Sequence, residues 1–170
     1  VFTGFGFGAA TTSVGEVCFN TSMTGYQEIM TDPSYAGQII NFTFPHIGNV
    51  GTNSKDLEAT TSAALGIIVR QPVTNPASWR TESSLDDWLA AQNLPGISGI
   101  DTRALTRRIR DLGAPRGALC HAPNGNIDTD AMFEMAKSWP GLKNMDLAKS
   151  VTSPDTKSWD EGSWQYDSSS

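Results

Sequence analysis

The stretch VGEVCFNTSMTGYQEIMTDPSY, residues 14–35, changes from one pattern of hydrophobic side chains to another. Its beginning, residues 14–20, is a short β-branched and aromatic run, which is typical of a strand. Residues 24–31 predict a short helix that buries Tyr26, Ile29 and Met30. Because proline disfavours helical geometry at the residue before it, the pair Asp32-Pro33 should end this helix. The fold prediction therefore begins from one strand followed directly by one helix.

Short runs of the same kind lie on both sides of this unit. They are bounded by Gly, Pro and Asn, and they predict strands at residues 1–7, 39–44, 65–69 and 118–121. The runs at 39–44 and 65–69 are nearly continuous in apolar residues, as expected for strands that are covered on both faces.

The second half of the chain is more helical. Ser84 is a suitable N-cap for a helix over residues 85–93, and Asp101 is one for a helix over 102–112 that Gly113 ends. A third helix is predicted at about residues 130–138. The side chains that these helices should bury are Leu85, Trp88 and Leu89, then Leu105, Ile109 and Leu112, and last Met132, Met135 and Ala136. Strands followed by helices and one more strand predict an α+β fold of layered sheets and helices.

Composition excludes several classes of function. The 12 Lys and Arg against 18 Asp and Glu give a net charge of −6 over 170 residues, which disfavours a nucleic-acid module. No apolar run approaches the roughly 20 residues of a membrane-spanning helix. Cys18 and Cys120 lie far apart and without zinc-ligand spacing, so we expect reduced thiols in strands and a cytoplasmic protein with no metal or cofactor of its own. A start at Val1 and an end at Ser170 suggest a segment of a longer protein.

Patterns typical of catalysis are incomplete. Residues 4–9 fit the letters GxGxxA, but only three residues precede them and a strand follows, so we expect a glycine-rich strand close to another backbone. No serine or cysteine lies in a glycine-flanked elbow. A self-contained small hydrolase using His46 or His121 with a nearby Ser or Cys is the alternative hypothesis, although isolated histidines more often make hydrogen bonds in loops. We therefore predict no catalytic residue.

Two features leave their function open. Arg103, Arg107 and Arg110 have helical spacing and form one basic stripe, which is either a solvated helix face or a docking surface for an acidic partner. Residues 20–35 are rich in small polar side chains, which is typical of a loop that offers hydroxyls to a ligand or to another domain, and equally of a structural turn.

Longer motifs identify a family. The chain resembles the small subunit of glutamine-hydrolysing carbamoyl-phosphate synthetase over nearly its whole length. The stretches that carry the resemblance are residues 15–29, 31–35, 44–49, 96–106, 141–148 and 158–164. The segment matches the N-terminal domain of that subunit, which implies a layered β/β/α fold over residues 1–150. Residues 151–170 would then be a linker to a C-terminal class I glutamine amidotransferase domain.

The resemblance also implies a function. The small subunit hydrolyses glutamine, and the large subunit uses the ammonia with bicarbonate, ATP and magnesium to make carbamoyl phosphate for arginine and pyrimidine synthesis. The catalytic cysteine, histidine and glutamate lie in the C-terminal domain, so the segment alone should be inactive. Its expected partners are the large subunit and that C-terminal domain. In the family, the serine of the Thr-Asp-Pro-Ser-Tyr run, here Ser34, reaches the glutamine pocket.

Overall fold

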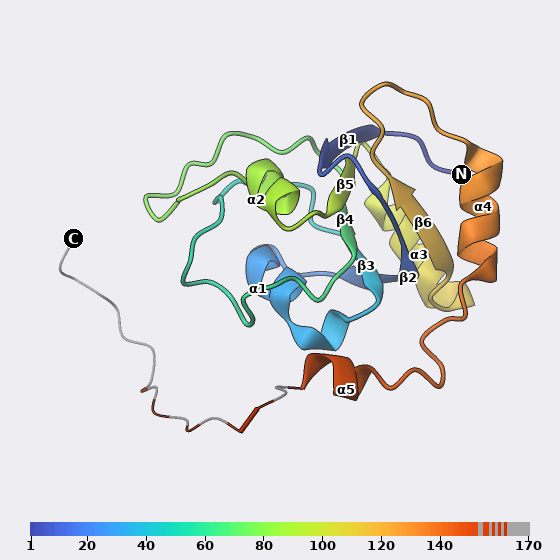
Figure 1. The fold of residues 1–170 in the computed structure, drawn as a ribbon. Coiled ribbons are helices and arrows are strands. Elements are labelled where there is room, and N and C mark those ends of the chain that lie inside the picture. Colours follow the sequence, from blue (N-terminus) through green and yellow to red (C-terminus); the bar gives the residue numbers. More distant parts are fainter. Residues whose placement is uncertain (153–154, 157, 159, 161, 163–170) are drawn as a thin grey trace.

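The computed structural model describes residues 1–152, 155, 156, 158, 160 and 162 (Figure 1). Along the chain, the elements are β1 (Phe5–Gly8), β2 (Thr12–Asn20), α1 (Tyr26–Thr31), the 3₁₀ helix η1 (Pro33–Tyr35), β3 (Gln38–Phe42), β4 (Gly66–Ile68), α2 (Leu85–Ala91), β5 (Pro95–Ser98), α3 (Thr102–Leu112), β6 (Arg116–Cys120), α4 (Thr129–Ser138) and α5 (Leu147–Val151). None of the helices in these ranges is long and apolar enough to cross a bilayer. The predicted linker, residues 151–170, falls largely outside the described residues.

The strands form one mixed sheet in the order β1-β5-β4-β3-β2-β6. The four central strands, β5, β4, β3 and β2, run parallel to one another, whereas β1 pairs antiparallel with β5 and β6 pairs antiparallel with β2 at the two edges. The link between β1 and β2, residues 9–11, can span only about 14 Å. The first and fifth strands of a flat sheet would lie about 19 Å apart. The sheet is therefore curled.

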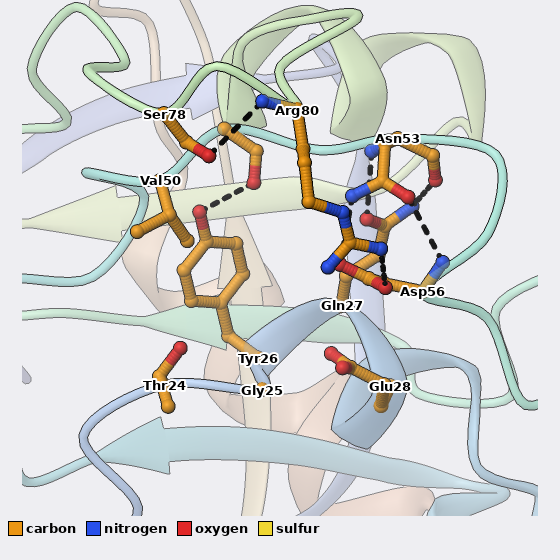
Figure 2. Close-up of a pocket in the computed structure, with 11 residues that line it drawn as sticks. Thr24, Gly25, Tyr26, Gln27, Glu28, Val50, Asn53, Asp56, Ser78 and Arg80 are labelled. Carbon is orange, nitrogen blue, oxygen red and sulfur yellow. Dashed lines mark hydrogen bonds and ion pairs between the residues drawn. The ribbon is translucent and has the colours of Figure 1, made fainter. Parts of the chain in front are cut away.

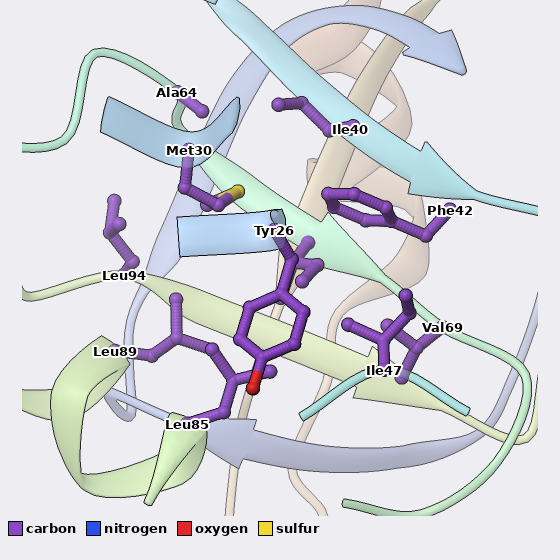
Figure 3. Close-up of a cluster of buried hydrophobic side chains, with 11 residues drawn as sticks. Tyr26, Met30, Ile40, Phe42, Ile47, Ala64, Val69, Leu85, Leu89 and Leu94 are labelled. Atoms are coloured by element: carbon purple, nitrogen blue, oxygen red, sulfur yellow. The ribbon is translucent and has the colours of Figure 1, made fainter. Parts of the chain in front are cut away.

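One face of the sheet, called here the α1–α2 face, packs against the first two helices. Figure 3 shows Tyr26 and Met30 of α1 between side chains of β3 and the leucines of α2. The fully packed members of this cluster are Tyr26, Met30, Ile40, Phe42, Ile47, Ala64, Ile67, Val69, Leu85, Leu89 and Leu94. These contacts fix the position of α1 and of the two long loops that flank it.

The opposite face, called here the α3 face, carries the second cluster: Val17, Ile39, Ile68, Ile100, Leu105, Ile109 and Leu119. Successive residues of β3 point to opposite faces, so Ile40 and Phe42 belong to one cluster and Ile39 to the other. Asn41 also points to the α3 face, where its Nδ2 donates to Thr102 O at 3.0 Å and to Thr106 Oγ1 at 2.9 Å. This buried amide attaches α3 to the centre of the sheet.

The predicted helix signals are confirmed. Ser84 accepts a hydrogen bond from Asp87 N, Asp101 accepts one from Ala104 N, and Gly113 follows the last residue of α3. The pair Asp32-Pro33 ends α1 after Thr31, as expected. The α+β class is also confirmed, while the layered β/β/α type stays a prediction.

Burial on two helices was predicted wrongly. Leu112 is 80% exposed, because the last turn of α3 extends beyond the cluster that holds Ile109. Helix α4 has no fully buried residue, and Met135 is 44% exposed. Met132 and Ala136, which were also predicted to be buried, are only half-buried. In Figure 1, α4 lies at the side of the sheet next to β6, so it covers an edge rather than a face.

Strand β5 and helix α5 were not predicted. The strand begins Pro95-Gly96, two residues that are rare inside strands. Gly96 is required because the ring of Phe7 on β1 packs against it: a Cβ added there would lie 2.6 Å from Phe7 Cζ. Gly4 and Gly8 likewise approach the backbone oxygens of Ser98 and Leu94, so the prediction of a glycine-rich strand against another backbone is confirmed.

Candidate functional site

A cavity of about 300 Å³ opens beside the beginning of α1 (Figure 2). Two long loops close it, one between β3 and β4 and one between β4 and α2. The lining residues are Thr24, Gly25, Tyr26, Gln27, Glu28, Val50, Gly51, Asn53, Asp56, Ser78 and Arg80. Part of the polar segment 20–35 therefore faces a cavity.

Hydrogen bonds fix the first loop on α1. The buried Gln27 side chain bonds to the backbone of Asn53 in both directions, donating from Nε2 to the carbonyl at 2.8 Å and accepting from the N–H at 2.9 Å. The Tyr26 hydroxyl donates to Gly51 O at 2.5 Å. Because both side chains are almost fully buried, the floor of the cavity is pre-formed.

An ion pair joins the two loops across the cavity. Arg80 Nη2 lies 2.6 Å from Asp56 Oδ1, and Asn53 Nδ2 donates to Asp56 Oδ2 at 2.7 Å. Both oxygens of the Asp56 carboxylate are thereby occupied. The pair is partly shielded from water, with about a third of each side chain exposed.

Glu28 has no such partner. Its Oε2 would lie 3.8 Å from a Cβ on Gly25, so the carboxylate is folded back over the beginning of α1. Burial raises the pKa of Glu28, and the nearby Asp56 and Glu58 carboxylates raise it further, while a hydrogen bond to its own backbone N–H and the nearby Arg80 oppose them. Burial, with Glu28 and Asp56, also raises the pKa of Tyr26, so its hydroxyl stays protonated.

Ser34 lies outside this cavity, in the middle of η1. The Asp32 side chain accepts from Ser34 N at 2.8 Å, and the Tyr35 hydroxyl accepts from Asn20 Nδ2 at 3.0 Å. The turn is therefore held from both ends. The Ser34 side chain is exposed, and its hydroxyl bonds to none of the described residues.

The chain returns to this turn near its C-terminal end. A Cβ on Gly37, just after η1, would lie 2.7 Å from Leu142 Cδ2, so the segment before α5 packs there. Figure 1 shows α5 beneath η1. Ser34 thus lies on the side of the molecule where the last described helix ends.

The three arginines of the predicted stripe are all exposed on α3. They point away from the cluster that contains Leu105 and Ile109, and Arg110 forms a 3.0 Å ion pair with its neighbour Asp111. The stripe is therefore a solvent-facing basic surface, distant in sequence from both the cavity and Ser34.

The histidines do not form a catalytic pair. His46 is exposed and lies edge-on to Phe44 with 6.5 Å between ring centroids. The His121 ring packs over Gly6, and its Nδ1 lies 3.2 Å from Ala9 O. Within residues 1–152, neither ring bonds to a serine or cysteine side chain. The geometry gives no support to the self-contained hydrolase.

The two thiols do not form a disulfide. Cys18 and Cys120 lie on neighbouring strands and are both free, as predicted. Burial raises the pKa of Cys18 to about 11, so little of it is thiolate at neutral pH. No group of three His, Cys, Asp or Glu side chains in the described part of the chain could hold a metal ion.

Comparison with known proteins places these motifs in a family. Residues 1–119 match the family model described as "Carbamoyl-phosphate synthase small chain, CPSase domain". The chain belongs to the carbamoyl-phosphate synthase small-chain family. It is 54% identical to the carbamoyl phosphate synthase small chain of Bradyrhizobium diazoefficiens, covering 98% of this chain and 43% of that protein.

Two further relatives agree with this assignment. The small chain of Zymomonas mobilis is 55% identical over 95% of this chain and 43% of its own length. The small chain of Caulobacter vibrioides is 49% identical over 98% of this chain and 44% of its own length. The chain therefore spans less than half the length of these carbamoyl-phosphate synthase small chains.

The cavity as a unit is not predicted by the sequence. Asn53, Asp56 and Arg80 lie in irregular loops without periodicity, and only the fold brings them to α1. A signal was present only for the α1 side, in the density of small polar residues before Tyr26.

Proposed function

We propose that this chain is the N-terminal domain of the small chain of glutamine-dependent carbamoyl-phosphate synthase, a cytoplasmic enzyme. It supports the hydrolysis of glutamine and docks the large synthetase subunit, which consumes the ammonia with bicarbonate and ATP. The reactive cysteine belongs to a C-terminal amidotransferase domain, so this portion alone has no glutaminase activity. The single observation that carries the proposal is Ser34, an exposed hydroxyl on a fixed turn within the family motif at residues 31–35.

Ser34 acts by positioning glutamine. The turn around it is held by Asp32 and by the Asn20–Tyr35 hydrogen bond, so the hydroxyl needs little ordering when it binds. A serine hydroxyl both donates and accepts, which suits the carboxylate and the ammonium group of an amino acid. The segment before α5 packs beside this turn, which favours a following domain that covers Ser34.

The test is Ser34→Ala in the full-length small chain assembled with its large subunit. Loss of one hydrogen bond to substrate should raise the KM for glutamine about fivefold, with kcat nearly unchanged. Ser138→Ala, on the outer helix α4, is the matched control and should behave as wild type. A KM for glutamine equal to that of the control would remove Ser34 from the glutamine site.

The arginine stripe is the proposed contact with an acidic surface of the large subunit. Arg107→Glu should weaken subunit association about tenfold at low salt, and the effect should shrink as salt is added, because exposed charges are screened. Lys137→Glu on α4 gives the same change in net charge away from the stripe. Titration of labelled small chain with large subunit measures both. Equal dissociation constants would mean that the stripe is only a solvated helix face.

A further inference from the structure

The cavity beside α1 carries an excess of negative charge. The Asp56 and Glu58 carboxylates raise the pKa of Glu28 there, and Arg80 is the cation that opposes them. Arg80 and Asn53 already occupy both oxygens of Asp56. Glu28 is left facing the cavity with a hydrogen bond to its own backbone N–H and with no ion pair or hydrogen bond to any other described residue. One further positive charge would fit the site.

The shape suits a single long side chain. A volume of about 300 Å³ is at the lower limit of the roughly 300–1,000 Å³ typical of small-molecule sites. In Figure 2, Tyr26 and Val50 lie next to each other on the left of the view, and Glu28 lies below the Asp56–Arg80 pair. An aliphatic stem could pack on the exposed Val50 while its charged end reaches Glu28.

Exposed apolar side chains are present in the lining of the cavity or directly next to it in the sequence. Met23 directly precedes Thr24 and is 66% exposed, Val50 is itself in the lining and is 41% exposed, and Trp79 between Ser78 and Arg80 is 72% exposed. Aromatic residues and methionine are enriched in protein–protein interfaces relative to the rest of the surface. A free metabolite would use the polar floor alone, whereas a protein surface would also cover these three side chains.

We propose that this cavity receives a lysine or arginine side chain of the large synthetase subunit, which pairs with Glu28 while the surrounding chain covers Met23, Val50 and Trp79. This inference rests on the proposed function, since it names a contact of the same subunit interface. It assigns to Glu28 a role in assembly and none in the chemistry of glutamine.

The first test measures assembly of the full-length small chain with its large subunit. Glu28→Gln keeps the shape of the side chain and removes its charge, and it should raise the dissociation constant of the complex about tenfold. Glu134→Gln on α4 removes the same charge from a distant exposed site and should leave the constant unchanged. The free Glu28→Gln chain should be at least as stable as wild type, which separates a lost contact from a damaged fold.

A second variant tests the cavity itself. Thr24→Trp places a large ring at the exposed edge of the lining and should weaken assembly by excluding the incoming side chain. Adding Glu28→Gln to Thr24→Trp should then cost little more, because both changes remove the same contact. Additive losses would contradict a shared contact and overturn the proposal.

The remaining outcomes separate this inference from the proposed function. If the wild-type chains do not assemble, the proposed function fails. If they assemble and Glu28→Gln matches Glu134→Gln, only the cavity proposal fails. If Glu28→Gln changes the KM for glutamine while assembly is unaffected, the cavity serves the small chain's own C-terminal domain, and the large-subunit assignment is overturned.

Discussion

The polar side chains on the two faces of the sheet differ in the contacts that they make. On the α3 face, Asn41 is fully buried and its Nδ2 donates to two acceptors on α3. On the α1–α2 face, the Glu28 carboxylate lies beside a cavity, and among the described residues it has a hydrogen bond to its own backbone N–H but no ion pair. The buried Asn41 amide holds the fold together through its N–H groups, although its Oδ1 has no partner among the described residues, whereas a carboxylate that lacks an ion pair at a cavity is a candidate for binding.

The difference also separates stability from function. The Asn41 contacts connect the central strand β3 with α3, so they are present whatever else binds the protein. The contacts around Glu28 connect the beginning of α1 with the two long loops, and the carboxylates there outnumber the one arginine, Arg80. Opposite changes of charge at these two positions should therefore change stability in opposite directions.

Asn41→Asp should give the largest effect. The new carboxylate would take the place of the Nδ2 donor, facing Thr102 O in a fully buried site. Thermal or urea unfolding at neutral pH should show a loss of about 3 kcal/mol or more. Because burial raises the pKa of such a carboxyl, the loss should shrink in acid, where the protonated group can again donate to Thr102 O.

Asn126→Asp is the matched control for this change. Asn126 is exposed in the loop before α4, so the same added charge should alter the free energy of unfolding by no more than about 0.5 kcal/mol. A small loss for Asn41→Asp, equal to that of the control, would mean that the α3 face accommodates a charge as easily as solvent does. The proposed contrast between the two faces would then disappear.

Much of the fold follows from local signals in the sequence. These signals act within a few residues, so their effects can be predicted from sequence alone. They are the apolar runs of the strands, the helix caps Ser84 and Asp101, and the pair Asp32-Pro33 that ends α1. The exposure of Leu112 could not be predicted, because helical spacing shows which residues share one side of a helix and not how far the surface that covers this side extends. Strand β5 depends on the fit of Phe7 against Gly96, a contact between residues far apart in the chain.

The candidate sites divide in the same way. Ser34 was named through a continuous motif, and its exposure on the turn agrees with a residue that faces outward. The cavity could not be predicted, because Gln27, Asn53, Asp56 and Arg80 become neighbours only when two long loops close over α1. Loop residues without periodicity carry no signal of where they meet.

Glu28→Gln should give the smallest effect, and its sign is the opposite of that at Asn41. The folded chain holds the pKa of Glu28 above its ordinary 4.5, so the ionised carboxylate destabilises the fold at neutral pH. A neutral glutamine removes this cost and should raise the free energy of unfolding at pH 7, by less than about 1 kcal/mol because solvent screens a half-exposed group.

The pH dependence gives this prediction its sharpest form. Stability gained from protonating Glu28 is fully present below the unfolded pKa of 4.5 and is lost as the pH rises through the folded pKa. The advantage of Glu28→Gln should therefore be largest at neutral pH and vanish below about pH 4.5. Urea unfolding of both proteins at a series of pH values measures it. A variant that is less stable than wild type at pH 7 would mean that the free fold already uses the charge of Glu28, and the two faces would then be alike.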